Sequence, residues 1–275
     1  MDEGADGGRE IAPDVDMQHP SDARVYDLLL GGKDNFEADR QLVHQVLTVA
    51  PELPEALQAN RRWLAEVVER LLREAAVLQF LDLGSGLPTA DNTHEIAARV
   101  SPKATVVYLD KDPTVIRHGQ ALLADDRRSF FAAGDLTDPA AVLADPIVTG
   151  ALDLSCPVAV LQCLVLHHIR ETKVARQIVD GYLEALPSGS YLAITHPCNP
   201  RDGSRQAEFA TEVEEKLRVG FRGVTFRTPA EIASLFEGLE LLEPGLVSLG
   251  EWWPSPAAEL GGASRLILAG LARKP

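Results

Sequence analysis

Residues 80–86 read Phe-Leu-Asp-Leu-Gly-Ser-Gly, and this short stretch decides the fold. Its apolar start is typical of a buried strand, and the glycines that follow predict a tight turn into a helix. Gly84 and Gly86 can take backbone angles that other residues avoid, and they let a ligand approach the main chain closely. Asp82 stands two residues before the first glycine, where its carboxylate would accept a hydrogen bond from a cationic amino group. Together these features predict a ligand site at the end of the strand.

Two more acids follow the next two predicted strands. Asp110 comes 26 residues after Gly84, at a strand end where an acid can accept both hydroxyls of a ribose. Asp135 stands between Gly134 and Leu136 at the end of the third strand, where it would accept a hydrogen bond from an adenine amino group. Taken singly, each acid is explained as well by a helix cap or a solvated loop charge. Because ligands of open α/β sheets bind at the carboxyl ends of the strands, three acids at successive ends predict one nucleoside site.

Strands and helices alternate from residue 77 onward, which predicts a parallel sheet with crossover helices. The length of 275 residues favours one sizeable core. The last two strands are expected to form a C-terminal hairpin. The predicted strands are Val77–Leu83, Thr105–Leu109, Ser129–Ala133, Val158–Leu161, Tyr191–Thr195, Leu239–Leu249 and Leu266–Leu271.

Two helix starts in this part of the chain carry clear signals. Asp112 followed by Pro113 predicts a capped helix, because proline lacks the backbone N–H that has no partner in a first turn. Thr228, Pro229 and Glu231 predict a capping box with proline at the first helical position. Further helices are expected at about 171–186 and 209–217.

The N-terminal part of the chain has a different pattern. Residues 1–18 read as a flexible acidic tail, and residues 19–73 read as a helical extension. This extension is unusually rich in polar and aromatic residues for a linker, at Tyr26, Lys33, Asp34 and Asn35. We expect it to form a lid that contacts substrate or cofactor and excludes water. The alternative is a pair of docking helices joined by a capped turn.

Four segments, taken in order, resemble the motifs of class I S-adenosylmethionine-dependent methyltransferases. They are DLGSG (82–86), YLDKDP (108–113), GDLTDP (134–139) and LVLHHI (164–169). More narrowly, PSDARVYDLLLGGKDNFEADR (20–40) with FLDLGSGLPTADNTHEIA (80–97) is similar to an actinobacterial methyltransferase family of undefined substrate, formerly catalogued as a domain of unknown function. The resemblance implies a three-layer αβα, Rossmann-like, seven-stranded domain over residues 74–275, with a C-terminal antiparallel hairpin. It also implies S-adenosyl-L-methionine as cofactor, S-adenosyl-L-homocysteine as product, and direct methyl displacement onto a small molecule.

The resemblance also implies roles for individual positions. The methionine part of the cofactor would contact Asp82, Gly84, Ser85 and Gly86. The ribose would contact Asp110, the adenine would contact Lys111, Asp135 and Leu136, and Gln162 would close the site after the fourth strand. The chain departs from the pattern at Leu87-Pro88-Thr89, where many methyltransferases have a third glycine. The fit around the carboxylate end of the cofactor is therefore the open part of this assignment.

His167 and His168, after the fourth strand, are candidate general bases, because methyl transfer to a hydroxyl or amine can use a group that titrates near pH 7. His196, after the fifth strand, is a weaker candidate. The alternative for the adjacent pair is a helix start that orients the loop. No metal site is expected, because adjacent histidines chelate poorly and His94-Glu95 lacks the second histidine of a zinc motif.

Composition limits the partners. The net charge is −15 and no stripe of Lys and Arg is present, which argues against nucleic acid. No apolar stretch is long enough to span a bilayer, and no secretory signal is evident, so we expect a cytoplasmic protein. Cys156, Cys163 and Cys198 fit reduced thiols. A small-molecule substrate is the expected partner, and the oligomeric state is left open.

Two other functions remain open from the sequence. An NAD(P)-dependent oxidoreductase also places GxG after a strand and an acid after the next strand. Asp82 and Asp135 oppose that function, because dinucleotide folds usually have an apolar residue at the first position. A non-catalytic S-adenosylmethionine-binding protein is the second alternative, and no sequence feature excludes it.

Overall fold

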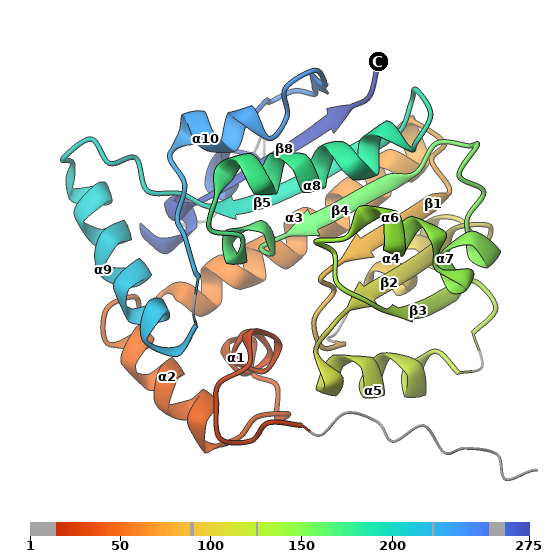
Figure 1. Ribbon diagram of the computed structural model, residues 1–275. Helices are drawn as coiled ribbons and strands as arrows, with labels where there is room; N and C mark the ends of the chain where they lie inside the picture. Colours follow the sequence, from red (N-terminus) through yellow and green to blue (C-terminus); the bar gives the residue numbers. More distant parts are fainter. Residues whose placement is uncertain (1–14, 89–90, 125, 222, 253–261) are drawn as a thin grey trace, which may run out of the picture.

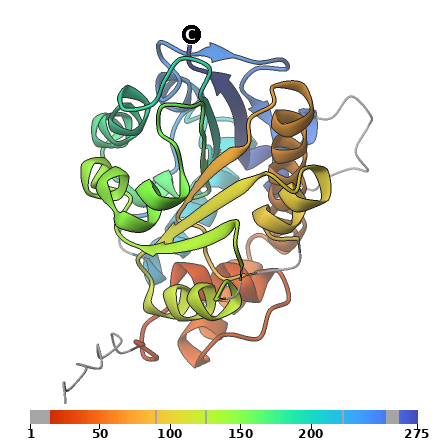
Figure 2. The same cartoon turned by 90° about the vertical axis from the view of Figure 1, so that its right-hand side faces the viewer.

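In the computed structural model, which describes residues 15–88, 91–124, 126–221, 223–252 and 262–275, helices cover both faces of one twisted mixed sheet (Figures 1 and 2). The strand order is β3-β2-β1-β4-β5-β8-β6, and β7 also pairs with β8. The first five strands run parallel, whereas β8 is antiparallel to β5, β6 and β7. The strands are β1 (Gln79–Leu83), β2 (Thr105–Asp110), β3 (Ser129–Ala133), β4 (Ala159–Cys163), β5 (Tyr191–Pro197), β6 (Glu240–Leu241), β7 (Val247–Ser248) and β8 (Ile267–Arg273). This arrangement confirms the expected Rossmann-like class.

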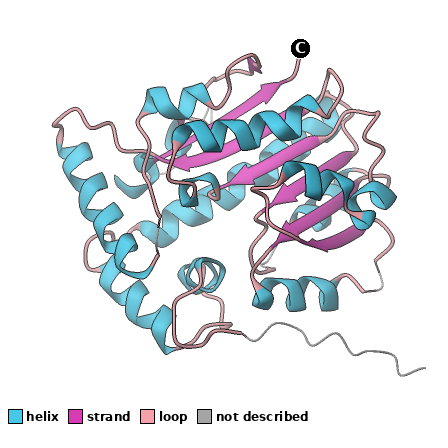
Figure 3. Ribbon diagram, in the orientation of Figure 1, coloured by secondary structure: helices cyan, strands magenta, loops and turns pink. Residues whose placement is uncertain are grey.

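The helices divide between the two faces of the sheet (Figure 3). One hydrophobic cluster joins the sheet to α3 (Leu53–Glu74), α4 (Thr93–Val100) and α5 (Pro113–Leu122). A second cluster joins the other face to α6 (Pro139–Ala144), α7 (Pro146–Ala151), α8 (Thr172–Glu184) and α10 (Pro229–Ser234). The remaining helices are α1 (Asp22–Leu29), α2 (Glu37–Leu47), α9 (Arg205–Gly220) and the short turns η1 (Leu166–His168), η2 (Leu249–Glu251) and η3 (Gly262–Leu266). Among the residues described, no helix has both the length and the apolar character needed to cross a bilayer.

Side chains of β1 alternate between these two clusters. Phe80 faces the layer of α3 and α4, whereas Leu81 and Leu83 face the layer of α6 and α8. Asp82 therefore points toward α3 and α4, where it accepts a hydrogen bond from Thr93. Because strands of a parallel sheet are buried on both faces, a buried carboxylate in β1 is a costly exception that calls for a partner.

Several sequence expectations are confirmed in detail. Asp112 caps α5 by accepting the backbone N–H of Thr114 at 2.7 Å, with Pro113 in the first turn. The capping box of α10 forms as expected, because Thr228 accepts the N–H of Glu231 and the Glu231 carboxylate accepts the N–H of Thr228. The third strand has the predicted bounds.

Two regions differ from the expectation. Residues 139–151 form the short helices α6 and α7, each started by an Asp-Pro pair, and the sequence analysis had not assigned them. The expected strand Leu239–Leu249 is broken into β6 and β7, because a turn containing Gly245 at φ 93° interrupts it. Both fragments still pair antiparallel with β8. Most of the predicted acidic tail, residues 1–14, lies outside the described residues, as do Thr89 and Trp253.

Candidate functional site

A cavity of about 580 Å³ opens at the carboxyl ends of β1, β2 and β4 and extends toward α1, α3 and α9. Figure 1 shows that the parallel strands point to the side of the molecule where these helices lie. The wall of the cavity includes most of the cofactor residues implied by the sequence: Asp82, Gly84, Ser85, Gly86, Asp110, Lys111, Asp135 and Leu136. The strand ends thus bring these eight residues together, as an open α/β sheet should.

The glycine turn after β1 has the backbone that its sequence predicts. Gly84 and Gly86 both have φ of 69°, and a Cβ on Gly84 would stand only 2.4 Å from Cγ2 of Val165. The N–H groups of Gly84 and Ser85 both donate to the carbonyl of Leu109, at 2.8 and 3.2 Å. These bonds fix the turn against β2 and leave the Ser85 hydroxyl buried without a partner in the protein. A hydroxyl in that state is a position for a ligand atom or a water.

Asp110 is held by backbone hydrogen bonds at the tip of β2. One carboxylate oxygen accepts the N–H groups of Lys111 and Asp112 at 2.8 and 2.9 Å, and the other accepts that of Gly86 at 2.9 Å. Burial raises the pKa of this carboxyl above its usual value. The carboxylate is therefore oriented before any ligand arrives, and it bridges the first two strand tips.

Asp82 is the more deeply buried acid. Its side chain accepts a hydrogen bond of 2.8 Å from Thr93, and burial raises its pKa to about 6. The nearby guanidinium of Arg61 acts in the opposite direction and stabilises the carboxylate. Arg61 comes from α3 and also lines the cavity. A carboxylate and a guanidinium therefore lie near each other at this end of the site.

The third strand tip carries the remaining charged pair. Lys111 Nζ lies 3.1 Å from the Asp135 carboxylate, and both side chains are substantially exposed. Leu136 adds an apolar contact beside Asp135, and its carbonyl accepts a hydrogen bond of 2.9 Å from Tyr182. This end of the cavity therefore combines an apolar surface with polar groups, as the adenine assignment requires.

Gln162 is placed differently from the other implied residues. It lies in β4 with its side chain completely buried, and it is absent from the cavity wall. Neighbouring Cys163 lines the cavity instead, because successive side chains of a strand point to opposite faces. Both polar atoms of the Gln162 amide lack a partner in the protein. Cys163 and the following residues Leu164 and Val165 are the part of this strand end that a ligand would meet.

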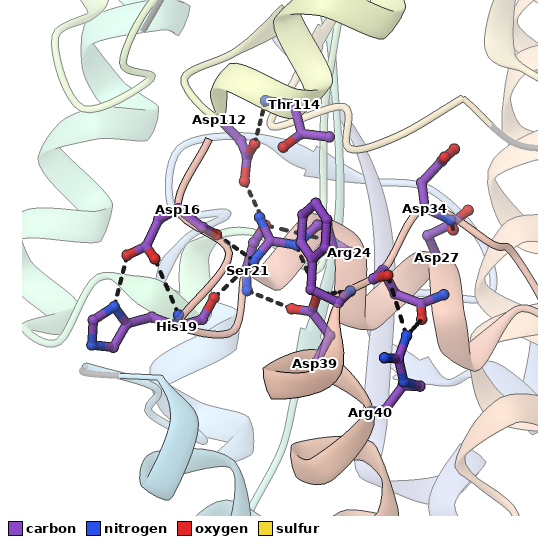
Figure 4. A network of polar contacts seen from close by, with 12 residues as sticks. Asp16, His19, Ser21, Arg24, Asp27, Asp34, Asp39, Arg40, Asp112 and Thr114 are labelled. Carbon is purple, nitrogen blue, oxygen red and sulfur yellow. Dashed lines mark hydrogen bonds and ion pairs between the residues drawn. The ribbon is translucent and has the colours of Figure 1, made fainter. Parts of the chain in front are cut away.

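Helix α1 lies beside the strand tips and is fastened there by a polar network (Figure 4). Arg24 and Asp39 form a buried ion pair at 2.8 Å, and the guanidinium lies 5.0 Å from the centre of the Phe36 ring. Asp39 also accepts the backbone N–H of Ser21, at 3.0 Å. The Ser21 hydroxyl donates to Asp112, two residues beyond Asp110. The N-terminal segment is thus joined directly to the acid-bearing end of β2.

The residues proposed for the lid separate into two groups. Tyr26 lines the cavity, and its hydroxyl accepts a hydrogen bond of 3.0 Å from Asn60 of α3. Lys33, Asp34 and Asn35 follow α1 and are not part of the cavity wall. The Asp34 carboxylate lies 3.9 Å from Nδ1 of His118, on α5. Helix α1 therefore borders the cavity, whereas Lys33, Asp34 and Asn35 in the loop after it do not.

The two adjacent histidines lie in η1, on the cavity wall, and Arg227 holds the loop that carries them. Its guanidinium donates to the carbonyls of Leu166 and Ile169, at 2.9 and 2.5 Å. Burial lowers the pKa of His167 well below its usual value. Burial also lowers the pKa of His168, to about 4.

His168 has an acidic neighbour that the sequence analysis missed. Nδ1 of His168 lies 3.5 Å from the Asp22 carboxylate, which projects from the first turn of α1. The Asp22 side chain is 51% exposed at the cavity mouth, and its partial desolvation, with Asp112 and Asp110 close by, raises its pKa to about 7. Asp22 and His168 therefore form a pair in which the carboxyl holds a proton more readily than the imidazole does.

His196 is a structural residue in this geometry. It is completely buried and absent from the cavity wall. Its Nε2 accepts a hydrogen bond of 2.6 Å from Arg227, so its Nδ1 carries the proton and donates to the carbonyl of Pro197 at 2.8 Å. Burial next to Arg227 lowers the pKa of His196 to about 3.

Asn60 and Arg61 of α3 were also missed, although the sequence carried a signal for Asn60. The buried residues of α3 form an apolar stripe that includes Leu57, Trp63 and Leu64, and Asn60 interrupts that stripe. Asn60 is 2% exposed, and its carbonyl oxygen Oδ1 has no partner in the protein. A buried amide oxygen without a donor on the wall of a cavity is a place for a ligand's N–H or O–H.

The remaining wall of the cavity is apolar. It is built by α1, by the start of α3, by α9 with the segment that follows it, and by η3 with the start of β8. We call this part the apolar chamber and define it by Val25, Leu29, Ala50, Leu53, Leu57, Leu64, Val213, Leu217, Phe221, Val224, Phe226, Ala263, Leu266 and Ile267. Within the described residues, no group of acids, histidines and cysteines is placed to hold a metal ion.

Comparison with known proteins agrees with this geometry. A family model described as S-adenosyl methyltransferase matches residues 8–275. A candidate methyltransferase from Thermobifida fusca YX is 40% identical, with a TM-score of 0.87 over 94% of this chain and 96% of that chain. A DUF574 family protein from Streptomyces avermitilis MA-4680 is 37% identical, with a TM-score of 0.88 over 95% of this chain and all of that chain.

More distant structures share the fold. An O-methyltransferase family protein from Burkholderia thailandensis is 16% identical, with a TM-score of 0.54 over 82% of this chain and 58% of that chain. No curated protein matches the chain.

Proposed function

We propose that this chain, which belongs to the S-adenosyl methyltransferase family, transfers a methyl group directly to a small-molecule acceptor held in the cavity. The family match makes the chain a methyltransferase with S-adenosylmethionine as its cofactor. It does not favour an NAD(P)-dependent oxidoreductase or a non-catalytic binding protein. The acceptor class, the direct displacement and the residue roles below are the proposed part.

One observation carries the nucleoside half of the proposal: the acids of successive strand tips border one cavity. Asp110 would hold the ribose, because three backbone N–H groups already orient its carboxylate and leave one of its about four lone-pair sites for a ribose hydroxyl. Asp135 and Leu136 would frame the adenine, with Lys111 beside it. The Ser85 hydroxyl, which has no partner in the protein, would bond to the cofactor near the glycine turn.

The amino-acid part of the cofactor is a zwitterion, so its site needs one negative and one positive group. Asp82 supplies the negative charge for the ammonium group, and Arg61 supplies the positive charge for the carboxylate. The unpartnered Oδ1 of Asn60 would accept a further N–H, and the Tyr26 hydroxyl would donate to the carboxylate. In this proposal, side chains of α1 and α3 would bind the carboxylate end, where many methyltransferases have the third glycine that this chain lacks.

When bound, S-adenosylmethionine supplies a methyl group on a cationic sulfur, so the acceptor's lone pair forms the new bond to carbon while the carbon–sulfur bond breaks and the sulfur keeps that electron pair. The protein's part is to hold the acceptor in line and to exclude water. The buried walls of the cavity accomplish the exclusion, since Val224 and Phe226 are at most 3% exposed.

A hydroxyl or amine acceptor also loses a proton. We assign the removal of this proton to Asp22 and His168. The Asp22 carboxylate lies 3.5 Å from Nδ1 of His168, and both residues line the cavity. His168 would orient the acceptor and pass the proton to Asp22, because the Asp22 pKa of about 7 lies above the His168 pKa of about 4. His167, whose pKa is lowered further by burial, is the less suitable base.

Calorimetry with two ligands tests the proposed site. S-adenosylhomocysteine carries the amino-acid end, whereas 5′-methylthioadenosine lacks it. Substituting Arg61→Met should weaken S-adenosylhomocysteine binding about 30-fold, because one charge-assisted contact contributes roughly 2 kcal/mol, and should leave methylthioadenosine binding unchanged. The matched control is Arg62→Met, the next residue on the same helix, which is exposed and absent from the cavity wall. Failure of the unmodified protein to bind S-adenosylhomocysteine would refute the proposal.

A further inference from the structure

We infer that the methyl acceptor is an uncharged, largely apolar small molecule whose body occupies the apolar chamber. This inference rests on the proposed function, because it assigns the second substrate of the same site. It is carried by a separate part of the cavity, which the cofactor residues do not form.

The chamber differs from the strand tips in charge. Each of its defining residues is apolar, although they come from four segments far apart in the sequence. The charged side chains on the cavity wall belong to the strand tips, to their loops, or to the adjoining turns of α1 and α3: Asp22, Asp82, Asp110, Lys111, Asp112, Asp135 and Arg61. Apart from Asp22 and Arg61, which lie on helices that also carry chamber residues, the charged groups thus come from the strand tips and their loops.

Burial makes this composition selective. The exposed fraction is 3% for Val213, 1% for Val224 and 2% for Ala263. A charged group placed among such side chains would lose its hydration without gaining a partner, which costs several kcal/mol. Each CH₂ group of a ligand that is buried there instead contributes about 0.8 kcal/mol of favourable binding free energy. The chamber therefore selects for apolar surface and against charge.

The charged side of the cavity does not offer an alternative place for a charged acceptor. Its two cations are already engaged, since Lys111 pairs with Asp135 and Arg61 is proposed to bind the cofactor carboxylate. An anionic acceptor would meet a surplus of carboxylates. An ammonium group would compete with the cofactor for Asp82 and Asp110. A neutral acceptor avoids both conflicts.

The chamber also adjoins the proposed proton acceptor. The ring of Phe221, on the chamber wall, lies edge-on to the His168 imidazole with their centres 6.4 Å apart. An acceptor that fills the chamber can therefore present one polar atom at its edge, near His168, while its body stays among apolar side chains. That single polar atom is the one that would be methylated.

Calorimetry with three naphthalene probes tests the inference on the protein saturated with S-adenosylhomocysteine. The probes are 2-naphthol, which is neutral at pH 7, 2-naphthoate and 2-naphthylmethylammonium. We expect 2-naphthol to bind at one site and at least tenfold more tightly than either charged probe. Equal or tighter binding of a charged probe would overturn the inference, as would a dissociation constant above about 1 mM for 2-naphthol.

Variants of α9 locate the binding. Leu217→Glu should weaken 2-naphthol binding at least tenfold, whereas Val219→Glu should not, because Val219 is 71% exposed and absent from the cavity wall. Leu217→Trp keeps the chamber apolar but reduces its volume, so it should also weaken 2-naphthol and gives a second variant if the charged one is unstable. Unchanged binding in both Leu217 variants would overturn the inference.

S-adenosylhomocysteine binding to the same proteins separates the two proposals. If it is normal while 2-naphthol shows no preference over the charged probes, the acceptor class is wrong and the proposed function stands. If it is lost in the unmodified protein, the proposed function itself fails.

Discussion

The two sides of the cavity are built in opposite ways. The strand-tip side consists of short consecutive motifs, each at the end of one strand, and it concentrates charge: Asp82, Asp110 and Asp135 border it. The apolar chamber gathers residues from α1, α3, α9 and η3, which are up to about 240 residues apart, and its defining side chains are all apolar. Local motifs therefore form the proposed cofactor site, whereas tertiary packing forms the proposed acceptor site. The comparison predicts that the two sides can be disabled separately.

Asp110→Ala is expected to give the largest difference between the effect on S-adenosylhomocysteine binding and the effect on 2-naphthol binding. Loss of the charge-assisted hydrogen bond to the ribose, together with loss of the carboxylate that holds the Gly86 N–H, should weaken S-adenosylhomocysteine at least 100-fold, or roughly 3 kcal/mol. Binding of 2-naphthol, measured on the protein without nucleoside, should change by less than twofold. Asp138→Ala is the control, because that carboxylate also accepts a backbone N–H, from Ala141, but lies outside the cavity wall. A parallel loss of naphthol binding would show that the two sides are not independent.

Asp82→Asn should stabilise the protein without ligand while impairing the cofactor site. The raised pKa of Asp82, about 6, means that the folded state favours the protonated form. Stability is therefore lost as pH rises from the unfolded value of 3.8 through about 6. The variant should gain about 3 kcal/mol in free energy of unfolding at pH 7.5 and about half of that at pH 5, by chemical denaturation. Glu55→Gln, on the exposed face of α3, should show no such trend.

The same carboxyl predicts a pH dependence of binding that only one side of the cavity should show. The ammonium group of S-adenosylhomocysteine needs Asp82 in its charged form, and the pKa of about 6 means that this form is lost as pH falls through 6. Affinity should therefore rise about tenfold between pH 5 and pH 7 and then level off. Binding of 2-naphthol should stay constant over this range. A flat profile for S-adenosylhomocysteine in the unmodified protein would contradict the ammonium assignment.

The smallest effect is expected at the link between α1 and the strand tips. Ser21 caps α1 and its hydroxyl donates to Asp112, so Ser21→Ala should cost about 1 kcal/mol of stability. Because α1 contributes to both sides, S-adenosylhomocysteine and 2-naphthol should each bind a few-fold more weakly. Thermal melting and the two titrations check this. Ser155→Ala, at an exposed turn distant in sequence from α1, should leave both ligands unaffected.

The strand tips could be predicted from sequence because their signals are local. A buried strand, a glycine pair and an acid are adjacent in the chain, and the parallel sheet places successive strand ends at one edge. Gln162 shows the limit of that approach. The motif places Gln162 on the strand that ends at the cavity. Because side chains alternate along β4, Gln162 points away from the cavity and Cys163 lines it.

Asn60, Arg61 and Asp22 could not be placed from sequence because they act across packing contacts. Each lies on a helix whose orientation over the sheet depends on distant residues, including the buried pair of Arg24 and Asp39. The break between β6 and β7 was missed although its signal is local, because Pro244-Gly245 marks the turn that separates the two strands. An interrupted apolar stripe was the available clue for Asn60.

The position of β8, between β5 and β6, has a consequence for how the protein is made. This strand, at residues 267–273, lies between β5 and the short edge strands, and its start also borders the chamber. Until β8 has been synthesised, the chain contains the earlier strands with Asp82, Asp110 and Asp135, but the edge of β5 that pairs with β8 has no partner. The strand tips that carry Asp82, Asp110 and Asp135 are therefore synthesised before β8 joins the sheet and adds Ile267 to the wall of the cavity.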